Sequence, residues 1–265
     1  MKKRHWLAFW VGGVVAIALS ACLQLSSAPP TAVDPTELLV SAAASLQEVL
    51  QDIQPLFEEA QAEVRLTYNF GASGALQQQI EQGAPADVFI SAAAKQMDAL
   101  EQGGLLLPES RRDLLGNQLV LVVPQNSPLN LSDFAQLADS QVRRISVGEF
   151  RTVPAGTYAE HVLTNLGILP QVQPKLVFAN TVRAGLAAVE SGNVDAGIVY
   201  ATDALSSNQV TQVTTAAADL HDPIVYPAAV IESSRNPEAA KNFLAFLESS
   251  LAEAVFEQHG FTLLD

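Results

Sequence analysis

The chain has 265 residues, of which 49% are apolar, and a formal net charge of −14 at neutral pH. This acidity argues against nucleic acid as a partner, although it does not exclude a small anion, whose binding depends on the local field of its site. The single cysteine excludes an intramolecular disulfide, so the apolar core must hold the fold together.

The N-terminal segment has the pattern of an export signal. Basic residues at positions 2–4 precede an apolar stretch from Trp6 to Leu19, shorter than the about 20 residues that a membrane-spanning helix needs. Cys22 follows Leu19-Ser20-Ala21, an order that resembles the lipobox of bacterial lipoproteins. We therefore expect a lipoprotein signal peptide at 1–21 and a lipid anchor on Cys22. The alternative is an ordinary signal peptide that happens to end in cysteine.

The segment that follows, residues 22–36, is rich in Ser, Ala, Pro and Thr and is expected to be a flexible tether. From Glu37 onward, short apolar runs alternate with helical patterns, which is typical of α/β architecture. Strands are predicted at 38–40, 64–70, 87–90, 119–123, 145–147, 176–178, 196–200 and 224–231. Helices are predicted at 46–60, 75–82, 156–166 and 182–191, around Met97, and twice after 238.

This order predicts two lobes, each a mostly parallel sheet flanked by helices, with the ligand in the cleft between them. Lobe 1 is expected to contain 37–118 and 228–265, and lobe 2 to contain 119–227. The alternative is one continuous doubly wound sheet. In such sheets, ligands bind beyond the carboxyl ends of the strands.

Four small, almost uncharged turns stand where a predicted strand gives way to a helix. A helix N-terminus presents unpaired backbone N–H groups and the positive end of the macrodipole, which favour an anion. Four such turns with almost no charge indicate a binding site made of neutral donors rather than an enzyme. The turns are Ala42-Ala43-Ala44-Ser45, Gly71-Ala72-Ser73-Gly74, Val153-Pro154-Ala155-Gly156 and Asn180-Thr181-Val182.

Several segments, in this order, are similar to a known family. They are Ala42–Leu46, Gly83–Ala92, Leu115-Gly116-Asn117, Val153–Gly156, Gly197–Tyr200, Tyr226–Val230 and Gly260-Phe261. Over about 38–263 the chain resembles the periplasmic molybdate-binding proteins of bacterial ABC transporters. That resemblance implies the two-lobed type II periplasmic-binding-protein fold, a molybdate ligand and an ABC permease in the inner membrane as partner. It implies a monomer without enzymatic activity, on the periplasmic side of the envelope and anchored there by lipid.

The resemblance also implies the ligand set. Ser45 and Ser73 would donate their hydroxyls, Ala155 and Val182 their backbone N–H groups, and Tyr200 its phenolic O–H. It implies no cofactor, and no metal other than the molybdenum of the oxyanion. The second turn departs from the family, whose members often carry a run of serines where this chain has Gly71-Ala72-Ser73-Gly74.

The chemistry of the ligand fits these positions. Molybdate at neutral pH carries no proton, so its oxygens only accept hydrogen bonds, and none of the five positions is acidic. Phosphate, which keeps a proton that a carboxylate can accept, is thereby disfavoured. Sulfate and thiosulfate remain alternatives, and tungstate is expected to bind as well, since it is nearly the size of molybdate.

Structural roles could explain some of the same residues. Ser45 and Ser73 could be helix N-caps, and Tyr200 a core residue. A different class of function, a serine hydrolase with Ser73 as nucleophile, is suggested by Gly71-Ala72-Ser73-Gly74-Ala75, which departs from G-x-S-x-G at its fifth position. Its base would be one of the histidines. The histidines show no metal-ligand spacing. We leave Asp87 and Arg183 out of the oxyanion site. The candidate bases are His161, His221 and His259.

Overall fold

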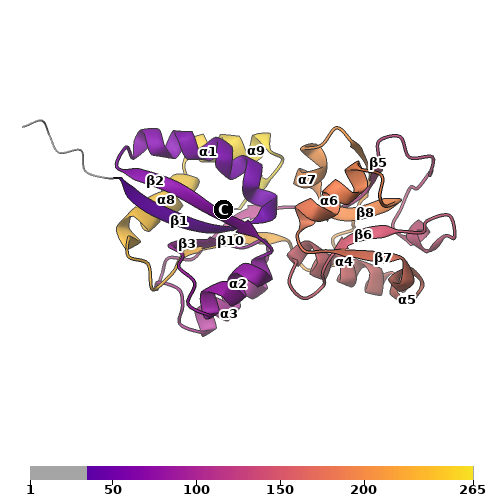
Figure 1. Cartoon of the computed structure of the whole chain (residues 1–265), viewed down its shortest axis with the longest axis horizontal. Helices are drawn as coiled ribbons and strands as arrows, with labels where there is room; N and C mark the ends of the chain where they lie inside the picture. The colour runs from indigo at the N-terminus through magenta and orange to yellow at the C-terminus, as the bar shows by residue number, and fades with distance from the viewer. Residues whose placement is uncertain (1–34, 265) are drawn as a thin grey trace, which may run out of the picture. The chain divides into compact units, whose positions relative to one another are not determined.

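The computed structural model describes residues 35–264, so the predicted signal peptide at 1–21, Cys22 and almost all of the tether lie outside the described residues. Within 35–264 the chain forms two β-sheets, each with helices on both faces (Figure 1). The fold class is therefore the expected two-lobed α/β arrangement, and the alternative of one continuous sheet is wrong. In this part of the chain we find no helix with the length and apolarity needed to cross a membrane.

The first sheet has the strand order β11-β4-β10-β3-β1-β2. β1 pairs in parallel with β2 and β3, whereas β10 is antiparallel to both β3 and β4. The strands are β1 (Thr36–Ala43), β2 (Val64–Gly71), β3 (Val88–Ile90), β4 (Arg112–Gly116), β10 (Val225–Val230) and β11 (Thr262–Leu263).

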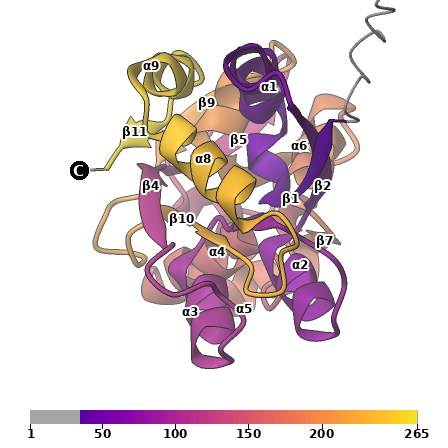
Figure 2. The same cartoon turned by 90° about the vertical axis from the view of Figure 1, so that its left-hand side faces the viewer.

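Helices cover both faces of this sheet because each has one apolar side. α1 (Gln47–Ala60), α8 (Pro237–Leu247) and α9 (Ser250–Gln258) lie on one face, and α2 (Ser73–Glu81) and α3 (Ala94–Gln102) on the other (Figures 1 and 2). On α1, the buried residues Val49, Leu50, Ile53 and Phe57 recur at helical spacing. Phe57 meets the rings of Phe243 and Phe246 of α8 edge-on, at centroid distances of 5.1 and 5.4 Å.

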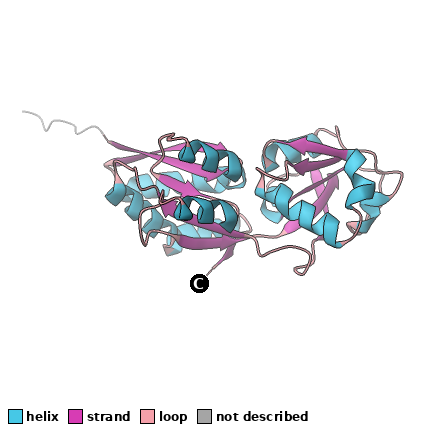
Figure 3. Ribbon diagram, turned by 90° about the horizontal axis from the view of Figure 1, so that it is seen from below, coloured by secondary structure: helices cyan, strands magenta, loops and turns pink. Residues whose placement is uncertain are grey.

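The second sheet has the order β7-β6-β8-β5-β9 and its own layers of helices, which are easiest to follow in Figure 3. α4 and α5 lie on one face, and α6 and α7 on the other. The strands are β5 (Leu119–Pro124), β6 (Ile145–Gly148), β7 (Leu176–Ala179), β8 (Ala196–Tyr200) and β9 (Val210–Thr215). The helices are α4 (Pro154–Asn165), α5 (Leu169–Val172), α6 (Val182–Glu190) and α7 (Ala201–Leu205), and three short 3₁₀ turns lie at Ala44–Leu46, Ala135–Ala138 and Gln173–Lys175.

Most strands of each sheet run in one direction, as expected, but neither sheet is wholly parallel. β10 and β11 run against the other strands of the first sheet, and β5 runs against the other strands of the second. β5 and β10 belong to the two passages of the chain between the sheets. Residues 225–227, which the sequence-based division assigned to lobe 2, pair with β4 in the first sheet, so β10 begins earlier than the expected return point.

Three strands and two helices were missing from the prediction; of the two helices, α5 has only four residues. β4 begins with two exposed charged residues, Arg112 and Asp113, and so lacks an apolar run. β9 is an edge strand with only one buried residue, Val210, and β11 has two residues. α7 has five residues, too few to show a helical period.

Candidate functional site

All five predicted ligand residues line one small cavity. Its volume is about 10 Å³, space for about one water-sized group and far too little for a sugar or a peptide. Each of the five is at most 4% exposed. The lining consists of Ala43, Ala44, Ser45, Gly71, Ala72, Ser73, Ala92, Val153, Pro154, Ala155, Val182 and Tyr200.

The cavity lies where strands end and helices begin. Ser45 is in the 3₁₀ turn after β1, and Ser73 is the first residue of α2 after β2. Ala155 lies in the first turn of α4, directly after Pro154, and Val182 is the first residue of α6. Tyr200 is the last residue of β8. Residues from both sheets therefore contribute to the same cavity.

Four backbone N–H groups at these positions have no partner in residues 35–264. They belong to Ser45, Ser73, Ala155 and Val182, and none of the hydrogen bonds in the described chain uses them. Each stands in a first helical turn, where no intrahelical acceptor exists. At α6 the N-cap Thr181 accepts from the N–H of Ala184 (3.1 Å), which leaves Val182 unused. Buried donors without acceptors are costly, so this cavity favours an acceptor.

The hydroxyl of Ser73 also remains available. Its oxygen accepts a hydrogen bond from the backbone N–H of Ala92 at 2.9 Å, so its own hydrogen is free to be donated. Ser45 Oγ lies 3.0 Å from the hydroxyl oxygen of Tyr226. Neither serine side chain caps its helix, so the N-cap interpretation is wrong for both.

Tyr200 is placed to donate a third hydroxyl. Its O–H lies 3.4 Å from the carbonyl oxygen of Ala92, a long contact that a stronger acceptor could replace. Burial raises the pKa of Tyr200 well above its ordinary value, so this phenol keeps its proton at any pH at which the protein works. The backbone N–H of Tyr200 donates to the carboxylate of Asp203 at 3.3 Å.

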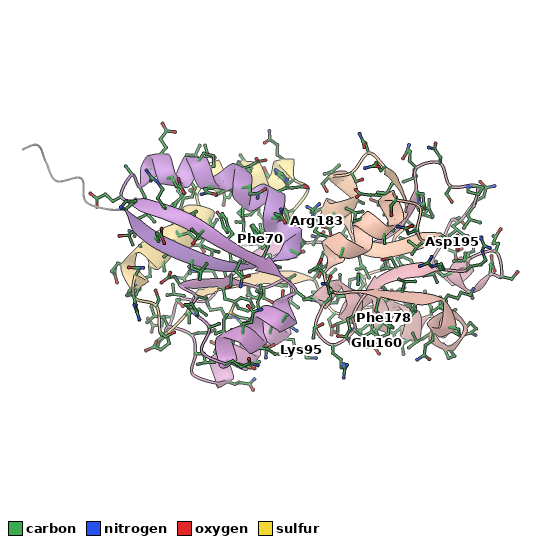
Figure 4. All side chains as sticks on the ribbon, viewed as in Figure 1. Phe70, Lys95, Glu160, Phe178, Arg183 and Asp195 are labelled. Atoms are coloured by element: carbon green, nitrogen blue, oxygen red, sulfur yellow. The ribbon has the colours of Figure 1, made fainter. Side chains whose placement is uncertain are left out.

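No charged side chain lines the cavity. The nearest cation along the chain, Arg183, follows Val182 and lies beside α1 (Figure 4). Its guanidinium is within 3.1 Å of carboxylate oxygens of Glu48 and of the fully buried Asp203. Arg183 is thus not an exposed helix arginine, because its side chain is 21% exposed and pairs with carboxylates of two other elements. Burial raises the pKa of Asp203 to about 6, although Arg183 opposes that rise.

A much larger cavity, about 760 Å³, lies between α3 and α4. Its lining mixes the carboxylates of Asp98 and Asp222 with the side chains of Lys95 and His161, and it contains none of the five predicted residues. By volume alone this cavity would be the candidate binding site. The small cavity is the better candidate, because its lining has backbone N–H groups without acceptors.

The structure also bears on the remaining sequence-based hypotheses, the serine hydrolase and the roles of Asp87 and the histidines. Ser73 bonds to the main chain, and none of the three histidines within residues 35–264 forms a hydrogen bond with it. Asp87 accepts from the backbone N–H of Leu39 (2.8 Å) and from Ser234 (2.6 Å), away from the cavity. The described part of the chain has no group of three or more His, Cys, Asp or Glu side chains placed to hold a metal ion.

Sequence reasoning missed two polar residues behind the cavity, Asn117 and Tyr226. Both residues lie in segments that carry the family resemblance, and their place in those segments was the one feature of the sequence that could have pointed to them. The contact of Tyr226 with Ser45 joins positions 181 residues apart, and Asn117 in turn bonds to Tyr226.

Comparisons with known proteins identify the family of the chain. Residues 38–262 match the model of a bacterial extracellular solute-binding protein family. A putative ABC transporter substrate-binding lipoprotein of Bacillus subtilis, YvgL, is 40% identical over 262 residues, covering 99% of each chain. The molybdate-binding protein ModA of Haemophilus influenzae is 38% identical over 232 residues, covering 85% of this chain and 90% of ModA.

Among solved structures, the substrate-binding domain of a putative molybdenum ABC transporter from Clostridium difficile superposes with a TM-score of 0.68 at 44% identity. The match covers 87% of this chain and all of that one. The chain therefore belongs to the bacterial extracellular solute-binding protein family, as a relative of its molybdate-binding proteins.

Proposed function

We propose that this protein is the substrate-binding component of a molybdate ABC importer, which captures the oxyanion and delivers it to a membrane permease. The observation that carries the proposal is the cavity lined by Ser45, Ser73, Ala155, Val182 and Tyr200, which is small, uncharged and rich in unpaired donors. Relatives named for molybdate binding support the choice of ligand.

In the proposed complex, the hydroxyls of Ser45, Ser73 and Tyr200 and the backbone N–H groups of Ala155 and Val182 donate to the four oxygens. The N–H groups of the two serines add further donors. Neutral donors in a water-excluded cavity stabilise a dianion without a counter-charge, because the surrounding medium screens them little. Tungstate offers the same acceptors and binds in the same way. The protein needs no cofactor and acts as a monomer.

The family places the protein outside the cytoplasm. We further propose that Cys22 is lipidated, which would hold the protein on the periplasmic side of the membrane beside its permease. The lipobox-like order before Cys22 and the lipoprotein relative YvgL support this anchor.

The first experiment compares ligands by thermal shift and calorimetry. Molybdate and tungstate are expected to raise the melting temperature and to bind tightly, whereas phosphate, which carries a proton, is expected to bind weakly. Sulfate is the second candidate, since it is also an unprotonated tetrahedral dianion. A larger shift with sulfate than with molybdate would transfer the assignment to sulfate.

The second experiment tests the residues. Ser45→Ala and Tyr200→Phe each leave one oxygen of the oxyanion without its donor, so each should weaken molybdate binding by roughly 1–3 kcal/mol. Calorimetry measures the loss. Ser207→Ala, which removes a half-buried hydroxyl bonded to Glu190 (2.6 Å) outside the cavity, is the matched control. Unchanged affinity in both site variants would mean that the anion binds elsewhere.

A further inference from the structure

A chain of three polar side chains, the half-buried Asn117 and the buried Tyr226 and Ser45, leads from the connection between the two sheets to the cavity. Asn117, between β4 and β5, donates through Nδ2 to the hydroxyl oxygen of Tyr226 at 3.2 Å. Tyr226, in β10, lies 3.0 Å from Ser45 Oγ. Tyr226 is fully buried, and neither it nor Asn117 lines the cavity. Of these three residues, Ser45 is the one that lines the cavity; the ring of Tyr226 also lies beside that of Tyr200, another lining residue, at a centroid distance of 5.8 Å.

The direction of these hydrogen bonds follows from the amide of Asn117. Its Oδ1 accepts from the backbone N–H of Gln118 at 2.8 Å, so its Nδ2 faces the other way. The two hydrogens on Nδ2 are donated to Thr202 Oγ1 (2.9 Å) and to Tyr226. The Tyr226 oxygen therefore accepts from Asn117, and its own hydrogen must find another acceptor.

Ser45 Oγ is that acceptor. It is the remaining hydrogen-bond partner of the Tyr226 hydroxyl among residues 35–264. Burial raises the pKa of Tyr226, so the phenol keeps its hydrogen. If Ser45 donated to Tyr226 instead, the hydrogen of Tyr226 would be left buried and unpaired.

We propose that Asn117 and Tyr226 are positioning residues that occupy the acceptor side of Ser45 and so fix its hydroxyl as a donor toward the bound oxyanion. This inference rests on the proposed function, because it assumes an oxyanion in the cavity. It goes beyond that function by assigning the orientation of one donor to two residues that do not touch the ligand.

The arrangement also has a consequence for selectivity. A protonated oxyanion such as hydrogen phosphate has a hydrogen to donate, and Ser45 can accept it only through the lone pair that Tyr226 leaves free. An unprotonated oxyanion offers acceptors alone and matches the Ser45 donor, so the chain Asn117–Tyr226–Ser45 favours unprotonated oxyanions.

A double-mutant cycle on the purified protein tests whether Tyr226 acts through Ser45. Calorimetry with molybdate compares the wild type, Ser45→Ala, Tyr226→Phe and the double variant. We expect Tyr226→Phe to weaken binding about tenfold in the wild-type background, the equivalent of ~1.4 kcal/mol. In the Ser45→Ala background it should have almost no further effect, because the hydroxyl it orients is gone. Fully additive losses would overturn the inference.

Tyr68→Phe is the matched control. The Tyr68 hydroxyl donates to the carbonyl oxygen of Leu50 at 3.1 Å, outside the cavity, so its removal should leave molybdate affinity unchanged. Thermal denaturation without ligand checks that each variant is folded.

Asn117→Asp gives a second test that does not remove the tyrosine. A carboxylate can only accept, so Tyr226 would donate to it, and Ser45 would donate to Tyr226. We expect molybdate affinity to fall to the level of Ser45→Ala, and phosphate to become a better competitor relative to molybdate. Wild-type affinity and selectivity in this variant would overturn the inference.

The outcomes separate this inference from the proposed function. A wild-type protein that binds no tetrahedral oxyanion would reject both. Loss of binding in Ser45→Ala, together with an additive cycle, would keep the proposed function and reject only the role of Asn117 and Tyr226.

Discussion

Among residues 35–264, Asp203 is the one carboxylate that is fully buried, and its environment makes it sensitive to pH. Its oxygens contact Arg183 Nε (3.1 Å) and accept from the Tyr200 N–H, while Glu48 adds a second negative charge near the same guanidinium. Burial, helped by the charge of Glu48, outweighs the contacts with Arg183 and Tyr200 and raises the pKa of Asp203 from 3.8 to about 6. Burial of Asp203 therefore lowers the free energy of unfolding at every pH at which its carboxyl group is ionised.

The pH dependence has a defined sign. Below pH 3.8 both the folded and unfolded states hold the proton, and burial of Asp203 carries no electrostatic cost. As the pH rises toward about 6, the unfolded state releases the proton first, so the free energy of unfolding falls, by at most about 3 kcal/mol. Asp203→Asn keeps an acceptor for Tyr200 N–H but cannot titrate. Urea denaturation at several pH values should show a smaller fall for this variant between pH 4 and 6, and parallel profiles would contradict the expectation.

The chemistry of each site residue also determines whether it could be predicted from the sequence. Ser45, Ser73 and Tyr200 carry hydroxyls that a search for donors can find. Ala155 and Val182 contribute only backbone N–H groups, so their selection depended on the family resemblance. The hydrogen bonds of Tyr226 and Asn117 could not be predicted, because they depend on contacts between strands far apart in the sequence.

At the scale of elements, the position of α4 depends on a close approach between two glycines. A Cβ on Gly156 would overlap the carbonyl oxygen of Gly148 at the end of β6, and would lie 2.9 Å from the carbonyl oxygen of Glu149. All of these are backbone atoms, which cannot turn away. The first turn of α4, which holds Ala155 at the cavity, therefore lies directly against β6.

Gly156→Ala should displace this helix start. We expect the free energy of unfolding to fall by about 1–3 kcal/mol, as overpacking of a tight contact does, and molybdate affinity to fall with it. Gly103→Ala is the matched control, since its nearest non-neighbouring atom, the carbonyl oxygen of Ala99, is 3.4 Å from the new Cβ. Chemical denaturation and calorimetry measure both effects. Equal stability of the two variants would show that α4 has room to move.

Helices could be predicted because their apolar residues recur about every 3.6 residues, and interior strands because theirs alternate or form short apolar runs. The prediction found α1, α6 and β8 close to their bounds in the structure. It missed β4 and β9, which lack that signal because exposed charged or polar residues make up much of each strand. Strand direction within each sheet is a property of chain connectivity, which no local pattern encodes.

At the scale of the whole molecule, a few contacts join the elements of the first sheet to those of the second beside the cavity. Gly74, in α2, donates its N–H to the carbonyl oxygen of Thr152, just before α4, at 2.9 Å. Arg183 of α6 pairs with Glu48 of α1 at 3.1 Å. The first contact needs glycine, because a Cβ on Gly74 would lie 2.7 Å from the carbonyl oxygen and 2.8 Å from the Cα of Thr152.

Gly74→Ala should therefore separate binding from folding. The three atoms nearest to the new Cβ all belong to Thr152, so the substitution disturbs the approach of α2 to the segment before α4 rather than the packing of α2 on its own sheet. Because Ser73 and Ala155 must meet around one anion, we expect molybdate affinity to fall about tenfold or more. The melting temperature without ligand should stay near that of the wild type.

Glu48→Gln, which removes only a partly exposed ion pair, should weaken binding less than fivefold. Wild-type affinity in Gly74→Ala would mean that the anion binds without this contact, and a large loss of melting temperature would mean that the glycine serves folding instead.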